Sequence, residues 1–140
     1  MTRELQGEAR EVARDFVARA RRLTPPACLI AGGETTVTVR GGGKGGRCQE
    51  FALAAALELA PSDRITILAA GTDGTDGPTE AAGAIVDGSC VARGASAGVD
   101  AGRALGDNDA YAFLRTSGDL VMSGPTRTNL LDLYLAVREP

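Results

Sequence analysis

The beginning of the chain carries apolar residues that recur every three or four positions. They run from Leu5 to Leu23, through a stretch otherwise rich in Arg and Glu. This spacing places them on one face of an α-helix, so we predict a helix from Glu4 to Leu23 with Thr2 as its N-cap. Pro25-Pro26 cannot continue a helix and should end it.

Short apolar and β-branched runs follow and predict strands. Cys28 to Ala31 is an apolar run typical of a buried strand, and Gly32 to Thr35 is typical of a hairpin connection. Thr36 to Arg40 alternates polar and apolar residues, as a strand with one wetter face does. From Arg47 to Leu59 the chain is dominated by Ala, Leu, Glu and Phe, which predicts a second helix that Pro61 stops.

The second half of the chain alternates between strand-like and helix-like segments. The pattern predicts strands at Ile65–Ala70, Ala84–Asp87, Leu120–Met122 and Leu130–Val137, and short helices at Ala101–Leu105 and Ala110–Leu114. Strands interspersed with helices favour an α/β fold, and we predict a single three-layer domain whose mixed β-sheet is flanked by helices. Aromatic residues make up only 4% of the sequence, so Ala, Val, Leu and Ile must build the core.

Size and composition narrow the function. A chain of 140 residues with 44% hydrophobic content is long enough for one domain with a core. Its net charge of -3, with both signs interspersed, argues against a nucleic-acid surface. The absence of His excludes Ser-His-Asp and Cys-His catalysis. Three cysteines without paired spacing fit a reducing cytoplasm, and no apolar run approaches the length of a membrane span.

The most unusual segment is the glycine-rich run from Gly41 to Arg47, which lies between a predicted strand and a predicted helix. Amides without neighbouring Cβ atoms, the helix dipole and the cations Lys44 and Arg47 together predict a loop that binds phosphate or carboxylate. The run has the form G-x-G-x-x-G, but the acidic residue expected about 20 positions later is missing, and the Walker pattern fails because Gly45 follows Lys44. A flexible solvent-exposed hairpin is the alternative.

A second candidate is the acidic loop after the strand at 65–70. Asp73 and Asp76 are each followed by glycine, and two nearby carboxylates can hold Mg²⁺ or orient a nucleophilic hydroxyl. Asp-Gly is also ordinary turn chemistry, which remains the alternative. For Glu50 we favour a structural ion pair with Arg47 on the same helix.

Four segments resemble one known family closely and in order: Gly32–Val39, Gly43–Glu50, Gly71–Gly83 and Gly124–Asn129. They resemble the MOFRL domain, the C-terminal domain of the type 2 glycerate kinase family, whose members are often labelled hydroxypyruvate reductase. The resemblance extends from about Pro26 to Val137. It implies that residues 26–140 form a MOFRL-like α/β domain and that residues 1–25 form a helix that links it to the preceding domain.

The resemblance implies transfer of the ATP γ-phosphate to a hydroxyl of D-glycerate, with Mg²⁺, at a cleft shared with a larger N-terminal Rossmann-like domain. It assigns catalytic roles to Arg47, Asp73 and Asp76, the two carboxylates also being the Mg²⁺ ligands. The expected substrate- and phosphate-binding residues are Glu34, Lys44, Gly45, Gly46, Thr79 and Asn129.

One residue departs from the family pattern, and the partner domain is not part of this sequence. The family usually has Asn at the position of Cys48, so one polar contact at the helix start is in question. With half a cleft, the chain alone should not catalyse. An NAD(P)-dependent hydroxypyruvate reductase domain and a non-catalytic anion-binding domain remain alternatives, and the chain is a candidate homo-oligomer.

Overall fold

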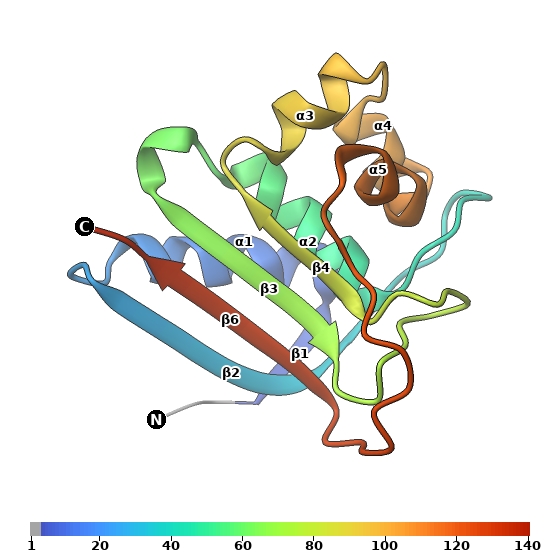
Figure 1. Cartoon of the computed structure of the whole chain (residues 1–140), viewed down its shortest axis with the longest axis horizontal. Helices are drawn as coiled ribbons and strands as arrows, with labels where there is room; N and C mark the ends of the chain where they lie inside the picture. Colours follow the sequence, from blue (N-terminus) through green and yellow to red (C-terminus); the bar gives the residue numbers. More distant parts are fainter. Residues whose placement is uncertain (1–3) are drawn as a thin grey trace.

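The computed structural model describes residues 4–140, which form a six-stranded mixed sheet and five α-helices (Figure 1). This confirms the α/β class. The strands are β1 Leu5–Glu8, β2 Ala27–Thr36, β3 Ile65–Gly71, β4 Gly83–Asp87, β5 Leu120–Val121 and β6 Asp132–Arg138. The helices are α1 Ala9–Arg21, α2 Arg47–Glu58, α3 Cys90–Ser96, α4 Ala101–Gly106 and α5 Ala110–Ser117, with a 3-10 turn at Pro61–Asp63.

The sheet places the last strand in its middle. The strand order is β1-β2-β6-β3-β4-β5, with β1 parallel to β2 and all other neighbours antiparallel. The register aligns one row of side chains across four strands, because Leu135 of β6 pairs with both Ile30 and Leu68, and Leu68 pairs with Ile85. The middle of the sheet is therefore built by pairing between segments that lie far apart in the sequence.

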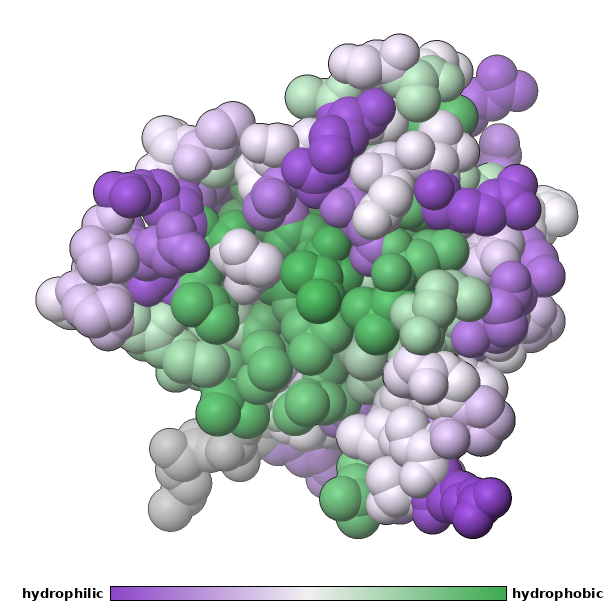
Figure 2. Space-filling model, viewed as in Figure 1, coloured by the Kyte–Doolittle hydropathy of each residue, from purple (hydrophilic) through white to green (hydrophobic). Residues whose placement is uncertain are grey.

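The helices cover one face of the sheet. Residues 65, 67 and 69 of β3 are buried beneath the helices, whereas the alternate positions are partly or fully exposed, as the two-residue period of a strand requires. The prediction of helices flanking the sheet in three layers was wrong in this respect, because no helix in residues 4–140 covers the second face. Figure 2 shows that face as a broad apolar surface.

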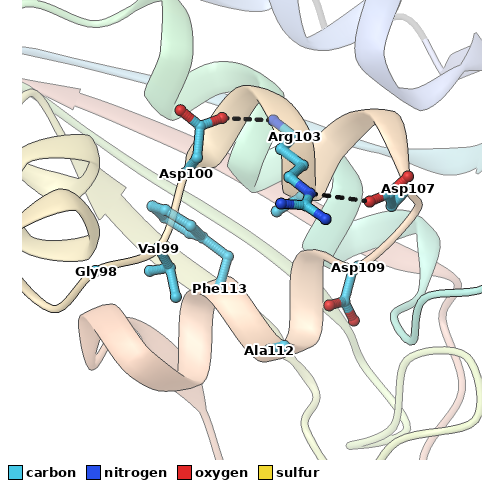
Figure 3. Close-up of a pocket in the computed structure, with 9 residues that line it drawn as sticks. Gly98, Val99, Asp100, Arg103, Asp107, Asp109, Ala112 and Phe113 are labelled. Carbon is cyan, nitrogen blue, oxygen red and sulfur yellow. Dashed lines mark hydrogen bonds and ion pairs between the residues drawn. The ribbon is translucent and has the colours of Figure 1, made fainter.

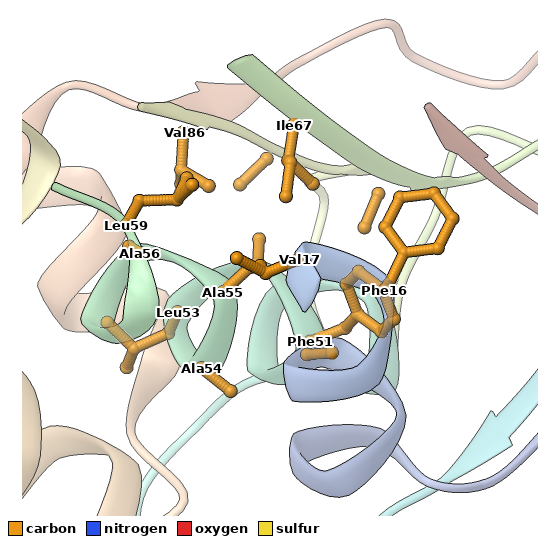
Figure 4. Packing of buried hydrophobic residues seen from close by; sticks show 14 of the residues in the cluster. Phe16, Val17, Phe51, Leu53, Ala54, Ala55, Ala56, Leu59, Ile67 and Val86 are labelled. Carbon is orange, nitrogen blue, oxygen red and sulfur yellow. The ribbon is translucent and has the colours of Figure 1, made fainter. Parts of the chain in front are cut away.

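The core lies between the sheet and helices α1 and α2 (Figure 4). Phe16 packs edge-on against Phe51 with ring centroids 5.7 Å apart, and Tyr134 lies 4.5 Å from Phe51. Ala52, Ala54, Ala55 and Ala56 let α2 approach the sheet and α1 closely; all four are at most 3% exposed. Alanine-rich packing thus compensates for the scarcity of aromatic residues, as predicted.

The first helix begins later than its hydrophobic period indicated. Residues Leu5–Glu8 form strand β1, and α1 starts only at Ala9. Leu5 and Val12 satisfy a helical spacing, but pairing of β1 with β2 offers the backbone of residues 5–8 a better set of partners. The proposed cap Thr2 lies outside the described residues. Residues 9–21 pack on α2 and share its core, so the described part of segment 1–25 belongs to the same body as the sheet.

The predicted hairpin at Gly32–Thr35 was wrong, because β2 is one continuous strand through Thr36. Gly33 has φ +151°, and a Cβ there would lie 2.2 Å from the carbonyl oxygen of Leu5. The glycine therefore allows β1 to approach β2 closely rather than allowing the chain to turn. The segment from residue 37 to residue 40, which we predicted to be a strand, is irregular.

The remaining predicted elements are present with small shifts at their ends, and helix α3, like strand β1, was not predicted from the sequence pattern. The three cysteines are free, with Cys28 exposed and the other two buried. Within the described residues, no helix is long and apolar enough to cross a membrane.

Candidate functional site

Several predicted residues come together at one edge of the sheet. Gly33 of β2 and Gly71 of β3 both pair with Asp132 at the start of β6, so the loops that follow β2 and β3 and the loop that precedes β6 meet there. The last two loops are linked directly: the Thr72 amide donates to the Leu131 carbonyl at 3.1 Å. Helix α2 begins at the same edge, with Arg47 as its first residue.

Arg47 is held at this edge by a carboxylate that the sequence reasoning missed. Its Nε donates to Asp132 Oδ2 at 2.6 Å and its Nη2 donates to Oδ1 at 2.9 Å. The Asp132 side chain is fully buried, and the hydroxyl of Tyr134 donates to it at 3.1 Å. The hydrogen bond to Asp132 raises the pKa of Arg47 above its usual value, so the guanidinium stays charged.

The guanidinium is nevertheless open to solvent on one side. The Arg47 side chain is 35% exposed, Glu34 Oε1 lies 3.5 Å from its Nη2, and Nη1 has no acceptor among residues 4–140. A bidentate carboxylate behind the guanidinium fixes its plane, and the free edge can donate to another anion in front. Arg47 is therefore the best-positioned anion-binding group among the predicted residues.

Asp76 occupies the start of α2. Its two carboxylate oxygens accept hydrogen bonds from the amides of Cys48, at 3.0 Å, and Gln49, at 2.8 Å. Burial raises the pKa of Asp76, which is 3% exposed, although the two amide bonds act in the opposite direction. A Cβ on Gly46 would lie 2.3 Å from this carboxyl group. The positive end of the helix is thus neutralised by the protein itself, which corrects the expectation that this terminus is free for a ligand.

The glycine-rich run is packed against the turn between α4 and α5. The Gly43 amide donates to the Asp107 carbonyl at 2.9 Å, and the Lys44 amide donates to Asp109 Oδ1 at 3.0 Å. A Cβ on Gly43 would lie 2.4 Å from Asp109 Cβ, so glycine is needed for this approach. The Lys44 ammonium lies over the ring of Tyr111, 4.9 Å from its centroid. The run is therefore not a free hairpin, and the amides of Gly43 and Lys44 already have acceptors within the protein.

The structure does not support a dinucleotide-binding role for this run. The fingerprint requires a strand directly before the glycines, and residues 37–40 are not one. The loop at Gly77 also packs closely against this part of the run, because a Cβ on Gly77 would lie 2.5 Å from the Gly45 carbonyl oxygen.

The two predicted metal ligands do different things. Asp73 Oδ1 accepts hydrogen bonds from the Thr75 amide at 2.9 Å and from the Thr75 hydroxyl at 3.2 Å, which is the pattern of an Asx turn. Asp76 points to the helix amides. No group of three or more acidic, Cys or His side chains able to hold a metal is found in the described part of the chain. This geometry gives no support to Mg²⁺ held by this pair alone.

Three other predicted residues also have internal partners. Thr79 accepts from Gln49 Nε2 at 2.8 Å and is 8% exposed, and Asn129 Oδ1 accepts from the Leu131 amide at 3.1 Å. Glu50 pairs with Arg10, not with Arg47: Arg10 Nη2 lies 2.5 Å from Glu50 Oε1. Of the predicted set, Gly46, Asp76 and Thr79 are buried, whereas Glu34, Arg47, Asp73 and Asn129 keep exposed surface at the edge.

The family model that describes the MOFRL family matches residues 27–132. The chain belongs to the MOFRL family. Among similar proteins, the D-glycerate 2-kinase of Thermotoga maritima is 47% identical over 98% of this MOFRL chain and 34% of its own length. The glycerate 2-kinase of Pyrococcus horikoshii is 41% identical over 98% of the chain and 33% of its own length.

The fold of the MOFRL chain is also shared with a solved structure. The crystal structure of a glycerate kinase from Thermotoga maritima superposes with a TM-score of 0.93 at 46% identity, covering 99% of this chain and 35% of the other. The chain thus spans about one third of the length of the relatives that it matches.

One pocket of this MOFRL chain lies away from the predicted residues. It has a volume of about 360 Å³ and is formed between α4 and α5, where Arg103 lies near two carboxylates (Figure 3). The Asp100 carboxylate caps α4 through the Arg103 amide at 2.7 Å, and Arg103 Nε lies 3.8 Å from Asp107. These groups have partners already, and none of the residues predicted for catalysis or binding lines the pocket. The sheet edge therefore remains the candidate site.

Proposed function

We propose that this chain is the C-terminal domain of a glycerate 2-kinase, which transfers the γ-phosphate of ATP to a hydroxyl of D-glycerate. Two relatives above 40% identity bear that activity in their names, and the fold is common to nearly the whole chain. The other two thirds of those relatives would be supplied by an N-terminal Rossmann-like domain, with the reaction at the cleft between the two.

The observation that carries the proposal is the half-open guanidinium of Arg47. D-glycerate has a carboxylate, and the transferred phosphoryl group carries negative charge on its oxygens in the transition state. Asp132 fixes the plane of the Arg47 guanidinium, and the edge of the guanidinium away from Asp132 is exposed to solvent. This edge can hold either group in one orientation. Positioning of this kind is most of what a phosphoryl-transfer enzyme must provide.

The contacts in this domain also indicate what it leaves to its partner. The amides of Gly43 and Lys44 have protein acceptors, and Asp76 fills the start of α2. ATP and its Mg²⁺ would therefore be bound mainly by groups of the N-terminal domain, while this domain holds the small hydroxy acid. Of the two predicted carboxylates, only Asp73 remains available to orient the reacting hydroxyl.

No structural observation specifically favours the two alternative functions, a reductase domain or a non-catalytic anion-binding domain. A nicotinamide-dependent reductase would need the dinucleotide fingerprint in its strand-to-helix setting, which the glycine-rich run lacks. A domain that binds an anion without catalysis would use the same Arg47 and is distinguished only by experiment. The cytoplasmic location that we infer from cysteine usage stays a prediction.

The test is an activity assay with the two parts supplied separately. The purified chain is incubated with ATP, Mg²⁺ and D-glycerate, and formation of 2-phosphoglycerate is measured before and after adding the separately produced N-terminal two thirds of the Thermotoga maritima enzyme. We expect no product from either part alone and product on mixing. A parallel assay follows NADH oxidation with hydroxypyruvate.

Product from the 140-residue chain alone would contradict the half-site proposal. Oxidation of NADH that depends on hydroxypyruvate would favour the reductase. If the two parts form a complex, shown by sedimentation, that binds D-glycerate but yields no product, the domain is an anion-binding module.

A further inference from the structure

One face of the sheet is apolar and uncovered in the described chain, and it meets the candidate site only at Glu34, near the end of β2. We call it the bare sheet face and define it by the outward-facing side chains of the four central strands: Ile30, Leu68, Ile85, Leu133, Leu135 and Val137. Ile30 is 55% exposed, Ile85 47% and Val137 43%. Figure 2 shows these strands as one continuous hydrophobic surface bordered by polar residues.

Such a face is unusual on a sheet that remains in water. An antiparallel sheet with one solvated face normally alternates apolar residues inward with polar residues outward. Here both sets are largely apolar, because Leu68, Ile85 and Leu135 face outward between inward-facing Ile67, Val86 and Tyr134. Contiguous exposed apolar surfaces of this kind commonly mark a site of association.

We propose that the bare sheet face is the interface of a weak homodimer, in which a second copy of this chain packs its own bare sheet face against it. Two sheets packed face to face lie about 10 Å apart and interdigitate their side chains, as in a β-sandwich. The row Ile30, Leu135, Leu68 and Ile85 would form the centre. The helices of each copy would remain on the outside.

The charges around the face are compatible with self-association. In a two-fold interface the same patch meets itself, so an unpaired charge in the middle would face its own copy. The only charged residues whose side chains alternate onto this side of β2, β3, β4 and β6 are Glu34 and Asp87, which lie at opposite ends of the sheet. Each already has an arginine partner, at 3.5 Å for Glu34 with Arg47 and at 3.0 Å for Asp87 with Arg93.

The area of the face sets the expected strength. Four strands about 4.8 Å apart and about seven residues long, at about 3.3 Å per residue, cover roughly 450 Å². Two copies would remove roughly 900 Å² from water, somewhat less than the ~1,200 Å² of a stable specific interface. We therefore expect a reversible dimer whose population depends on concentration in the micromolar range or above.

The experiment is sedimentation velocity of the 140-residue chain over a hundredfold range of concentration, with three variants. Ile30→Lys and Ile85→Lys place a charge on the face from two different strands, at positions exposed enough for the fold to tolerate it. Val39→Lys is the matched control, because Val39 is 75% exposed and lies outside the sheet. Circular dichroism and a thermal melt establish that each variant is folded.

We expect the average mass of the unmodified chain and of Val39→Lys to rise to twice that of one copy, and both face variants to remain monomeric. A readout without any mutation is the rate at which Cys28, exposed beside Ile30 on this face, reacts with a thiol reagent; this rate should fall several-fold as the dimer forms. The proposal does not depend on kinase activity.

Three results would overturn it: a chain that stays monomeric at all concentrations, a dimer that survives both lysine variants, or growth into assemblies larger than two. If the chain is monomeric alone, and the face variants instead weaken its complex with the N-terminal kinase domain, then that domain covers the face and the dimer is excluded.

Discussion

Replacement of Asp132 by Asn should loosen Arg47 and destabilise the domain. The Asp132 carboxylate is fully buried and accepts two hydrogen bonds from the guanidinium and one from the hydroxyl of Tyr134. Asn has nearly the same shape but carries no charge and has only one acceptor atom on its amide. Its nitrogen would present N–H groups to those of Arg47, so one bond is lost and one contact becomes unfavourable.

The expected loss of stability is about 2–3 kcal/mol. A hydrogen bond to a charged group contributes about 1.5–3 kcal/mol, and breaking one partner of a fully buried ion pair costs about 3–5 kcal/mol. Because Arg47 is 35% exposed, water can partly solvate the cation that remains, and the upper range does not apply.

The assay is urea denaturation at pH 7, with the free energy of unfolding taken at constant slope. Asp87→Asn is the matched control, because Asp87 also pairs with an arginine, Arg93, but its side chain is 45% exposed. That exposed pair should contribute at most about 1 kcal/mol. The free energies of unfolding of Asp132→Asn and of the unchanged chain could instead agree within about 0.5 kcal/mol, roughly the resolution of the method. In that case the Arg47 guanidinium is not fixed by this carboxylate, and the described geometry of the site is wrong.

Three further changes test the local arguments. Gly46→Ala should destabilise the chain by about 1–3 kcal/mol because its Cβ would overlap the carboxyl of Asp76, whereas Gly42→Ala, with no atom within 4 Å, should be nearly neutral in the same urea assay. Asp63→Asn should lower the free energy of unfolding by about 0.5–1 kcal/mol at pH 7. The hydrogen bond from Arg21 of α1 lowers the pKa of Asp63, so the stabilisation is present above the usual pKa of an Asp and is lost as the pH falls. Thermal melts of the two proteins should therefore coincide at about pH 2. Titration with a thiol reagent at low protein concentration should detect Cys28 alone in the folded chain and all three cysteines in urea; reaction of a second thiol without unfolding would contradict the described burial.

The hydrophobic period was sufficient to predict most of the fold, because the strands and helices bury one face or stripe each. It failed where pairing between distant segments decides the backbone. Leu5–Glu8 had a helical spacing but pairs with β2, and the glycines at 32 and 33 resembled a turn although Gly33 serves close approach of β1. Neither contact leaves a local signal in the sequence.

The site was predictable as a set of loops but not as a set of contacts. The glycine-rich run suggested amides aimed at a ligand, yet the amides of Gly43 and Lys44 donate to the α4–α5 turn. Asp76 was predicted to be functional because of its loop. Its carboxylate instead accepts a hydrogen bond from the amide of Cys48 at the start of α2, 28 positions away in the sequence. Asp132 was missed because it reads as the first polar residue of a final strand, and only the register across β2, β6 and β3 brings it to Arg47.

The central claim is that Arg47 of this domain holds an anionic group in a glycerate kinase cleft completed by another domain. The most direct measurement is the glycerate kinase activity of a chimera in which this chain replaces the matching third of the Thermotoga maritima D-glycerate 2-kinase. We expect ATP-dependent formation of 2-phosphoglycerate, lowered about 100-fold or more in kcat/KM by Arg47→Gln and little changed by Arg115→Gln, an exposed arginine of α5. A folded chimera without activity, or one in which Arg47→Gln retains full activity, would contradict the account.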